Sequence, residues 1–102
     1  MKSNKGIPPS LSSVLWSYNL EKLDLEKHKR LIITQVLNYG TWEEVKWLFS
    51  VYGEGEIRET LLNPIRGSWW PKVLNFWLTL LEIEIPEKVY KRAVIRIEPR
   101  FQ

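Results

Sequence analysis

The chain has 102 residues and a mass of 12.2 kDa, the size of one compact domain. Its composition, 44% hydrophobic and 26% charged, is that of an ordinary globular protein and argues against a disordered or low-complexity chain, while the absence of cysteine excludes disulfides, thiolate metal sites and a cysteine nucleophile. The formal net charge is +3, and the basic excess lies at the two ends of the chain, which indicates either solvated tails or contacts with phosphate groups.

The first forty residues predict two helices. A polar lead-in covers residues 1–9, and Ser10 is placed to cap a short helix. A longer helix follows Asp24, whose carboxylate can accept hydrogen bonds from the free amides of the first turn, and Gly40 supplies its C-terminal stop. Apolar residues at helical spacing predict its buried stripe: Leu25, Ile32, Ile33, Val36, Leu37 and Tyr39.

A capping box is the clearest local signal in the sequence. Thr41 and Glu44 match the pattern T-x-x-E, which predicts a helix from about Trp42 to Tyr52 that ends at Gly53. A short helical segment over 56–62 follows and is broken by the Asn63-Pro64 pair. The side chains expected to face the core are Val45, Leu48, Phe49, Tyr52, Ile57, Leu61 and Leu62.

The next helix is expected over about 71–82, with Pro71 at its first position. Its polar residues form one narrow stripe and the others are apolar, which is typical of a central helix or of a half-exposed helix that receives a partner. The centre is favoured in a domain this small. Near the C-terminus the pattern allows either a helix over 87–93 or a strand over 93–98 that pairs with 82–85 in a small ribbon.

These elements predict a mainly α fold, a compact bundle of four to five short helices, with a small C-terminal β ribbon as the alternative end. The helical domain is expected over 10–85 and a basic C-terminal extension, helix or strand, over 86–102. Apolar runs fall far short of the roughly 20 residues that cross a bilayer, and no basic-then-apolar leader opens the chain. We therefore expect a cytoplasmic protein without membrane contact.

Candidates for catalysis are few. The only histidine, His28, lies between two lysines, which is typical of a solvated surface residue. Glu54, Glu56 and Glu59 open a helix, where negative charge offsets the helix dipole. No phosphate-binding glycine motif occurs. We therefore expect no enzymatic activity, no catalytic residue, no metal and no cofactor.

The segment 66–72 combines aromatic and basic residues and is the candidate partner-binding site. Trp69 and Trp70 lie in a turn between Arg66 and Lys72. Tryptophan and arginine are common anchors of protein interfaces, and aromatic rings also stack on unpaired bases. Structural packing, a protein partner and nucleic acid are therefore the three interpretations of this segment.

A helix-turn-helix is the alternative interpretation of the middle of the chain. The capped helix, a glycine turn over 53–55 and the segment 56–62 match that motif in length and order. The second helix should present basic or amide side chains to base edges, and two glutamates there argue against duplex binding. The residues that would contact nucleic acid under this interpretation are Lys46, Arg58, Arg92 and Arg96.

Several short motifs carry a family resemblance. They are Leu15-Trp16, Leu23-Asp24, Val36-Leu37-Asn38-Tyr39-Gly40, Trp47-Leu48-Phe49, Tyr52-Gly53, Glu56-Ile57-Arg58 and Leu74-Asn75-Phe76-Trp77. Through them, residues 11–83 resemble a family of small, uncharacterised prokaryotic helical proteins. Members are often encoded beside abortive-infection type, nucleotidyltransferase-like toxins, and some relatives are described as helix-turn-helix proteins.

The resemblance implies an antitoxin-like or adaptor role with a nucleotidyltransferase-like protein as partner. A DNA-binding transcriptional regulator is the alternative that the helix-turn-helix pattern suggests. A homodimer joined through the C-terminal tail is the third.

Overall fold

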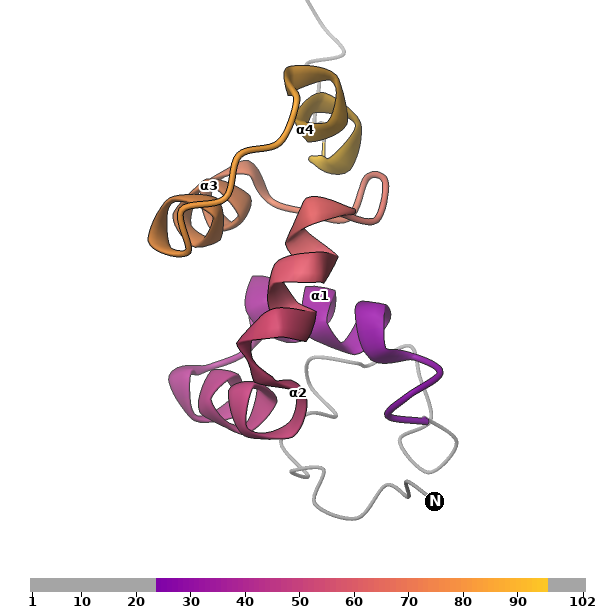
Figure 1. Ribbon diagram of the computed structural model, residues 1–102, viewed down its shortest axis with the longest axis vertical. Coiled ribbons are helices and arrows are strands. Elements are labelled where there is room, and N and C mark those ends of the chain that lie inside the picture. The colour runs from indigo at the N-terminus through magenta and orange to yellow at the C-terminus, as the bar shows by residue number, and fades with distance from the viewer. Residues whose placement is uncertain (1–23, 96–102) are drawn as a thin grey trace, which may run out of the picture.

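The computed structural model describes residues 24–95, which form four helices (Figure 1). These are α1 (Lys29–Tyr39), α2 (Trp42–Leu62), α3 (Pro71–Leu80) and α4 (Glu87–Ala93). The predicted mainly α fold is confirmed. The expected lead-in over 1–9 and the expected helix after Ser10 lie outside the described residues, as does the tail from residue 96 onward.

A capped turn leads the chain into α1. Asp24 Oδ1 accepts hydrogen bonds from the backbone amides of Glu26 and Lys27, at 2.8 and 2.9 Å. The amide of His28 donates to the Asp24 carbonyl at 2.8 Å, which closes one helical turn before α1 begins. The capping role predicted for Asp24 is therefore present, although α1 itself starts at Lys29.

Gly40 ends α1 because its backbone lies very close to the last turn. Its amide donates to the Val36 carbonyl at 2.8 Å, and an added Cβ would lie 2.7 Å from the same oxygen. The predicted stop is confirmed, with extended backbone at Gly40. The predicted buried stripe of α1 is also confirmed apart from Tyr39, which is 40% exposed.

The helix α2 has a sharp corner at Gly53. Thr41 and Glu44 form the predicted capping box, and the Thr41 amide donates to Glu44 Oε1 at 2.8 Å. Gly53 has φ 79° and ψ 166°, so a first arm over 42–52 and a second arm over 54–62 run in different directions (Figure 1). The predicted helix end is therefore a corner, and the second arm starts directly after it.

The core forms where α1 packs against both arms of α2. The expected inward residues of α2 are buried, except that Phe49 is half-buried and Leu62 is 48% exposed. Leu62 is exposed because successive residues of a helix are rotated by about 100°, which turns it away from the face that buries Ile57 and Leu61. The remaining core residues come from later segments: Trp69, Leu74, Trp77, Leu78, Ile83 and Ala93.

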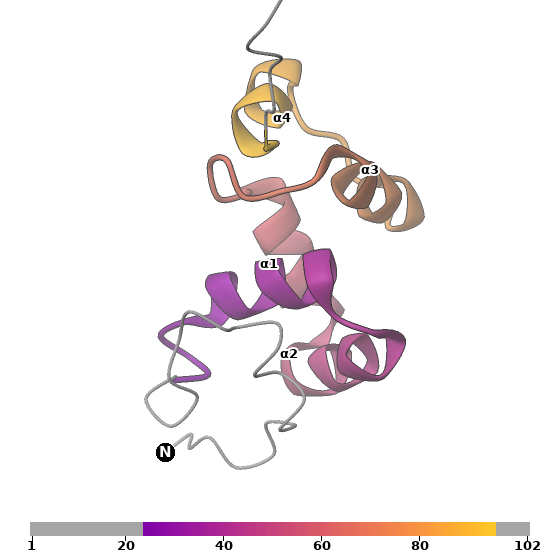
Figure 2. The ribbon, with the colours of Figure 1, turned by 180° about the vertical axis from the view of Figure 1, so that it is seen from behind.

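The helix α3 lies at the side of the molecule, and the predicted central position is wrong (Figures 1 and 2). Its buried side chains are Leu74, Trp77 and Leu78, whereas Phe76 and Leu80 are each 56% exposed. Only the face of α3 that carries Leu74, Trp77 and Leu78 packs on the core, and Phe76 and Leu80 lie outside that face. The helix also ends at Leu80, two residues earlier than expected.

The C-terminal segment is helical over 87–93, and up to residue 95 it does not form the alternative ribbon with 82–85. Val94 instead makes an isolated parallel bridge with Trp69. Ser68 donates to the Ala93 carbonyl at 2.9 Å, and Ile95 donates to the Trp69 carbonyl at 2.7 Å. The backbone of residues 93–95 thus pairs with the backbone around Trp69 and not with residues 82–85. None of the four helices has the length and apolar character to cross a bilayer.

Candidate functional site

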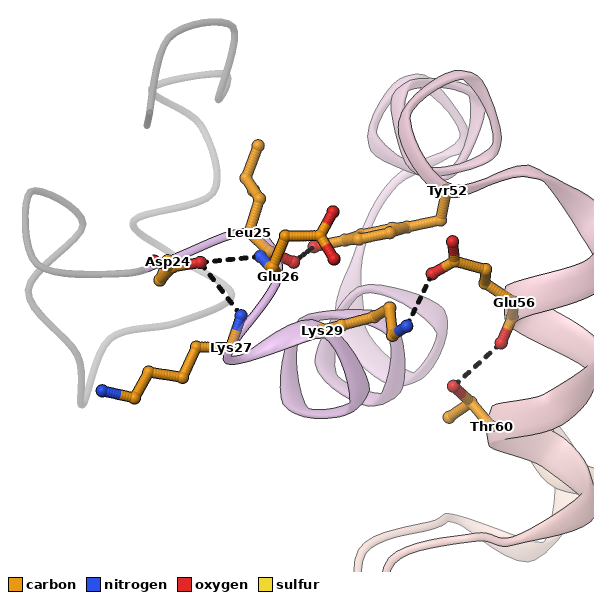
Figure 3. Close-up of polar contacts among 8 residues, drawn as sticks. All are labelled: Asp24, Leu25, Glu26, Lys27, Lys29, Tyr52, Glu56 and Thr60. Atoms are coloured by element: carbon orange, nitrogen blue, oxygen red, sulfur yellow. Dashed lines mark hydrogen bonds and ion pairs between the residues drawn. The ribbon is translucent and has the colours of Figure 1, made fainter. Parts of the chain in front are cut away.

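A polar clamp fastens both arms of α2 to the entry of α1 (Figure 3). Tyr52, at the end of the first arm, donates its buried hydroxyl to the Leu25 carbonyl at 2.7 Å. Glu56, in the second arm, forms an ion pair with Lys29 Nζ at 2.9 Å. Thr60 Oγ1 donates to the Glu56 carbonyl at 3.1 Å. These contacts tie down the chain on both sides of Gly53.

Raised pKa values keep the Tyr52 hydroxyl and the Lys29 ammonium protonated. Burial raises the pKa of Tyr52, and the nearby carboxylates of Glu26, Glu56 and Asp24 raise it further, so the hydroxyl remains a donor. The hydrogen bond to Glu56 raises the pKa of Lys29. Both groups therefore keep the protons that they donate within the clamp.

Two of the three glutamates at the start of the second arm form ion pairs. Glu56 pairs with Lys29, and Glu54 pairs with Arg58 at 3.1 Å. His28 is half-buried and accepts a hydrogen bond from the Asp24 amide at Nδ1, at 2.9 Å, so it is less solvated than expected. Among residues 24–95 no group of three or more histidine, aspartate or glutamate side chains could hold a metal ion.

The four residues predicted to bind a partner do not form one surface. Trp69 is fully buried, so the structure places it in the core rather than on the candidate site. Trp70 is half-buried; its amide donates to Asn38 Oδ1 and its indole N–H donates to the Tyr39 hydroxyl, both at 3.0 Å. Arg66 and Lys72 are exposed but line two different depressions.

The first depression, which we name the apolar groove, holds about 350 Å³ between α3 and the junction of α1 and α2. Trp42 is 66% exposed and Phe76 is 56% exposed there, and Lys72 is the only charged residue in the lining. Phe76 packs edge-on against Trp77, with ring centroids 5.2 Å apart. The remaining lining residues are Leu37, Gly40, Val45 and Val73.

Sequence reasoning placed Trp42 only as the first residue of a capped helix and did not predict the apolar groove that it lines. The available signal was the apolar composition of the helix predicted over 71–82. A helix that is apolar on all but one narrow stripe cannot bury every apolar side chain against one core face. Phe76 and Leu80 are the side chains left exposed.

The second depression, which we name the basic hollow, holds about 610 Å³ between α4 and the loop that precedes α3. Four cationic side chains line it: Arg66, Lys88, Lys91 and Arg92. The rest of its lining is Gly67, Val94 and Ile95, so no acidic residue is part of it. The Gly67 amide donates to the Arg92 carbonyl at 2.8 Å, which holds the loop against α4.

The four residues proposed for nucleic-acid contact are likewise dispersed. Lys46 pairs with Glu43 at 3.3 Å. The Arg58 guanidinium pairs with Glu54 and donates to the Leu81 carbonyl at 2.8 Å. Arg92 lines the basic hollow, and Arg96 lies outside the described residues. Figures 1 and 2 place the first arm of α2, which carries Lys46, and α4, which carries Arg92, at opposite ends of the described part of the molecule.

Fold and surface together define a small, mainly helical domain with one apolar and one basic depression. The chain belongs to a family of unknown function, DUF6922, which matches residues 11–61. The match covers α1 and nearly all of α2, and it ends before α3 and α4. No curated protein and no solved structure matches the chain.

Proposed function

We propose that the chain is a cytoplasmic, non-enzymatic protein-binding module whose partner occupies the apolar groove. The observation that carries this proposal is the exposure of two large aromatic side chains, Trp42 and Phe76, from two different helices around one apolar depression. Aromatic side chains in a depression are the residues that most often dominate the energy of a protein interface. Burying each on binding would contribute about 1.5–3 kcal/mol before the costs of association.

The groove favours an amphipathic helix of the partner. Its lining is apolar apart from one cation, Lys72. Lys72 can form an ion pair with an acidic residue beside the apolar face of the partner helix. The resemblance described above supports a nucleotidyltransferase-like protein as that partner. The chain would then act as its antitoxin-like or adaptor companion.

The test is a binding measurement with a nucleotidyltransferase-like protein encoded beside the gene for this chain. Titration calorimetry would compare the native chain with Trp42→Ala and Phe76→Ala. Both exposed residues can be removed without opening the core, and we expect each change to weaken binding at least about tenfold, as for an interface anchor. Leu62→Ala is the matched control, because Leu62 is exposed but does not line the groove.

Three results would contradict the proposal. The first is unchanged affinity in both groove variants. The second is an equal loss of affinity in Leu62→Ala. The third is a homodimer in solution that Phe76→Ala dissociates, because a second copy of the chain would then be the occupant of the groove.

The helix-turn-helix regulator remains the second candidate function, with weaker support. The second arm of α2 would be its recognition helix, and the one arginine there is already engaged by Glu54 and the Leu81 carbonyl. Under this alternative, Arg58→Glu should abolish binding to the promoter of its own gene in a gel shift at low salt.

A further inference from the structure

We propose that the basic hollow binds the phosphate backbone of a duplex nucleic acid. This site is separate from the apolar groove, and it does not use the second arm of α2. It therefore goes beyond the protein-binding role and stands or falls independently of it.

The cations of the hollow converge from two segments that are far apart in the sequence. Arg66 comes from the loop before α3, whereas Lys88 and Arg92 come from α4. Hydrogen bonds from the Gly67 amide to the Arg92 carbonyl and from the Trp69 amide to the Ala93 carbonyl, at 2.8 and 3.0 Å, hold the two segments together. The two segments that carry the cationic side chains are thus joined by backbone hydrogen bonds.

Most of this positive charge is not neutralised within the described part of the chain. Lys91 pairs with Glu87 at 3.1 Å, but Arg66, Lys88 and Arg92 form no ion pair with any residue of the range 24–95. Cations crowded within a Debye length of one another raise the local potential and favour an anionic ligand. Clustering them here is unfavourable for the free protein and favourable once several phosphates bind.

The rest of the lining favours the backbone of a duplex over a single strand. Proteins that bind single strands combine basic grooves with aromatic rings on which bases stack, and the hollow has no aromatic residue in its lining. A duplex carries one negative charge per roughly 1.7 Å of its axis, so several phosphates fall within reach of three cations. Arginine and lysine contacts to phosphate fix position without reading sequence, so we expect binding that is independent of sequence.

Fluorescence anisotropy with a labelled 20-base-pair duplex tests this proposal on the full-length chain. Each phosphate contact contributes about −0.9 to the slope of log affinity against log salt, so Arg66→Ala/Arg92→Ala should make the slope shallower by about 1.8 and weaken binding at low salt. Lys27→Ala/Arg30→Ala is the matched control. It removes the same charge from exposed residues outside the hollow and should leave the slope unchanged. Both double variants should keep the native circular dichroism spectrum.

Four results would overturn the proposal. The first is the absence of binding at 50 mM salt. The second is an equal effect of the two double variants, which would mean that only net charge matters. The third is equal or tighter binding of a single strand of the same length. The fourth is displacement of the duplex by free nucleotide at equal phosphate concentration. Either of the last two would assign the hollow to a different ligand.

Discussion

Gly53 is the position where one added methyl group tests the architecture most directly. Its φ of 79° and ψ of 166° lie in a region that is essentially restricted to glycine, and an added Cβ would meet nothing within 4 Å. The cost of Gly53→Ala is therefore backbone strain alone, about 1–3 kcal/mol. For a domain of this size that corresponds to a decrease of Tm by about 4–8 °C for each kcal/mol.

Gly55 supplies a control of opposite sign two residues away. It is helical, and an added Cβ there also meets nothing within 4 Å. Gly55→Ala should therefore stabilise the fold by about 0.5–1 kcal/mol, because alanine loses less backbone entropy than glycine on entering a helix. The two variants add the same atoms to the same helix and differ only in the backbone conformation that receives them.

Urea denaturation followed by tryptophan fluorescence and far-ultraviolet circular dichroism would measure both changes. We expect a lower midpoint for Gly53→Ala, a higher midpoint for Gly55→Ala and similar m-values for both. If Gly53→Ala were as stable as the native chain or more stable, a continuous helix would be acceptable at residue 53. The reasoning from the corner would then be refuted.

Two further predictions concern the capped turn and the core. Asp24→Ala should lower Tm at pH 7, because hydrogen bonds from the Lys27 and Glu26 amides stabilise the Asp24 carboxylate and hold its pKa below the ordinary value of 3.8. In thermal melts over a series of pH values, the difference in Tm from the native chain should persist above pH 3.8. It should vanish at lower pH, as the carboxyl of the folded chain becomes protonated. Trp69→Ala should cost about 3–5 kcal/mol in urea denaturation, whereas Trp69→Phe should cost much less, because it keeps a buried ring and removes an indole N–H that finds no acceptor among the described residues; equal losses would contradict this account.

Local signals in the sequence predicted the helix boundaries well. The capping box at Thr41, the stop at Gly40 and the break at Gly53 each depend on residues within one or two helical turns, so they are readable without the fold. At Gly40 the structure adds a reason that the sequence did not show. The backbone there is extended, and a Cβ would lie too close to the Val36 carbonyl.

The placement of helices and side chains against the core was less accessible. Trp69 and Trp70 are neighbours with the same chemistry, and the structure buries one fully and leaves the other half-buried. That difference depends on the backbone bridge between Trp69 and Val94, which only tertiary structure creates. The exposed face of α3 has the same origin, because the sequence does not say how much of the core α1 and α2 already fill.

The candidate surfaces show a similar division. From the sequence, Arg66 and Lys72 were grouped as parts of one segment, and Arg92 was assigned to a different set of basic residues. The fold separates Arg66 from Lys72 and brings Arg66 next to Arg92. Proximity in the chain was the basis of the first grouping, and contact between the loop before α3 and the end of α4 decides the second.

The corner at Gly53 also connects the part of α2 that lines the apolar groove to the part that leads to the basic hollow. The first arm of α2 contributes Trp42 and Val45 to the apolar groove, and the second arm leads into the loop that carries Arg66. Because Tyr52 and Glu56 fasten the two arms to α1, the angle between them is fixed by contacts on both sides of one glycine. The relative position of the groove and the hollow therefore depends on this one backbone conformation, together with the contacts that hold the two arms.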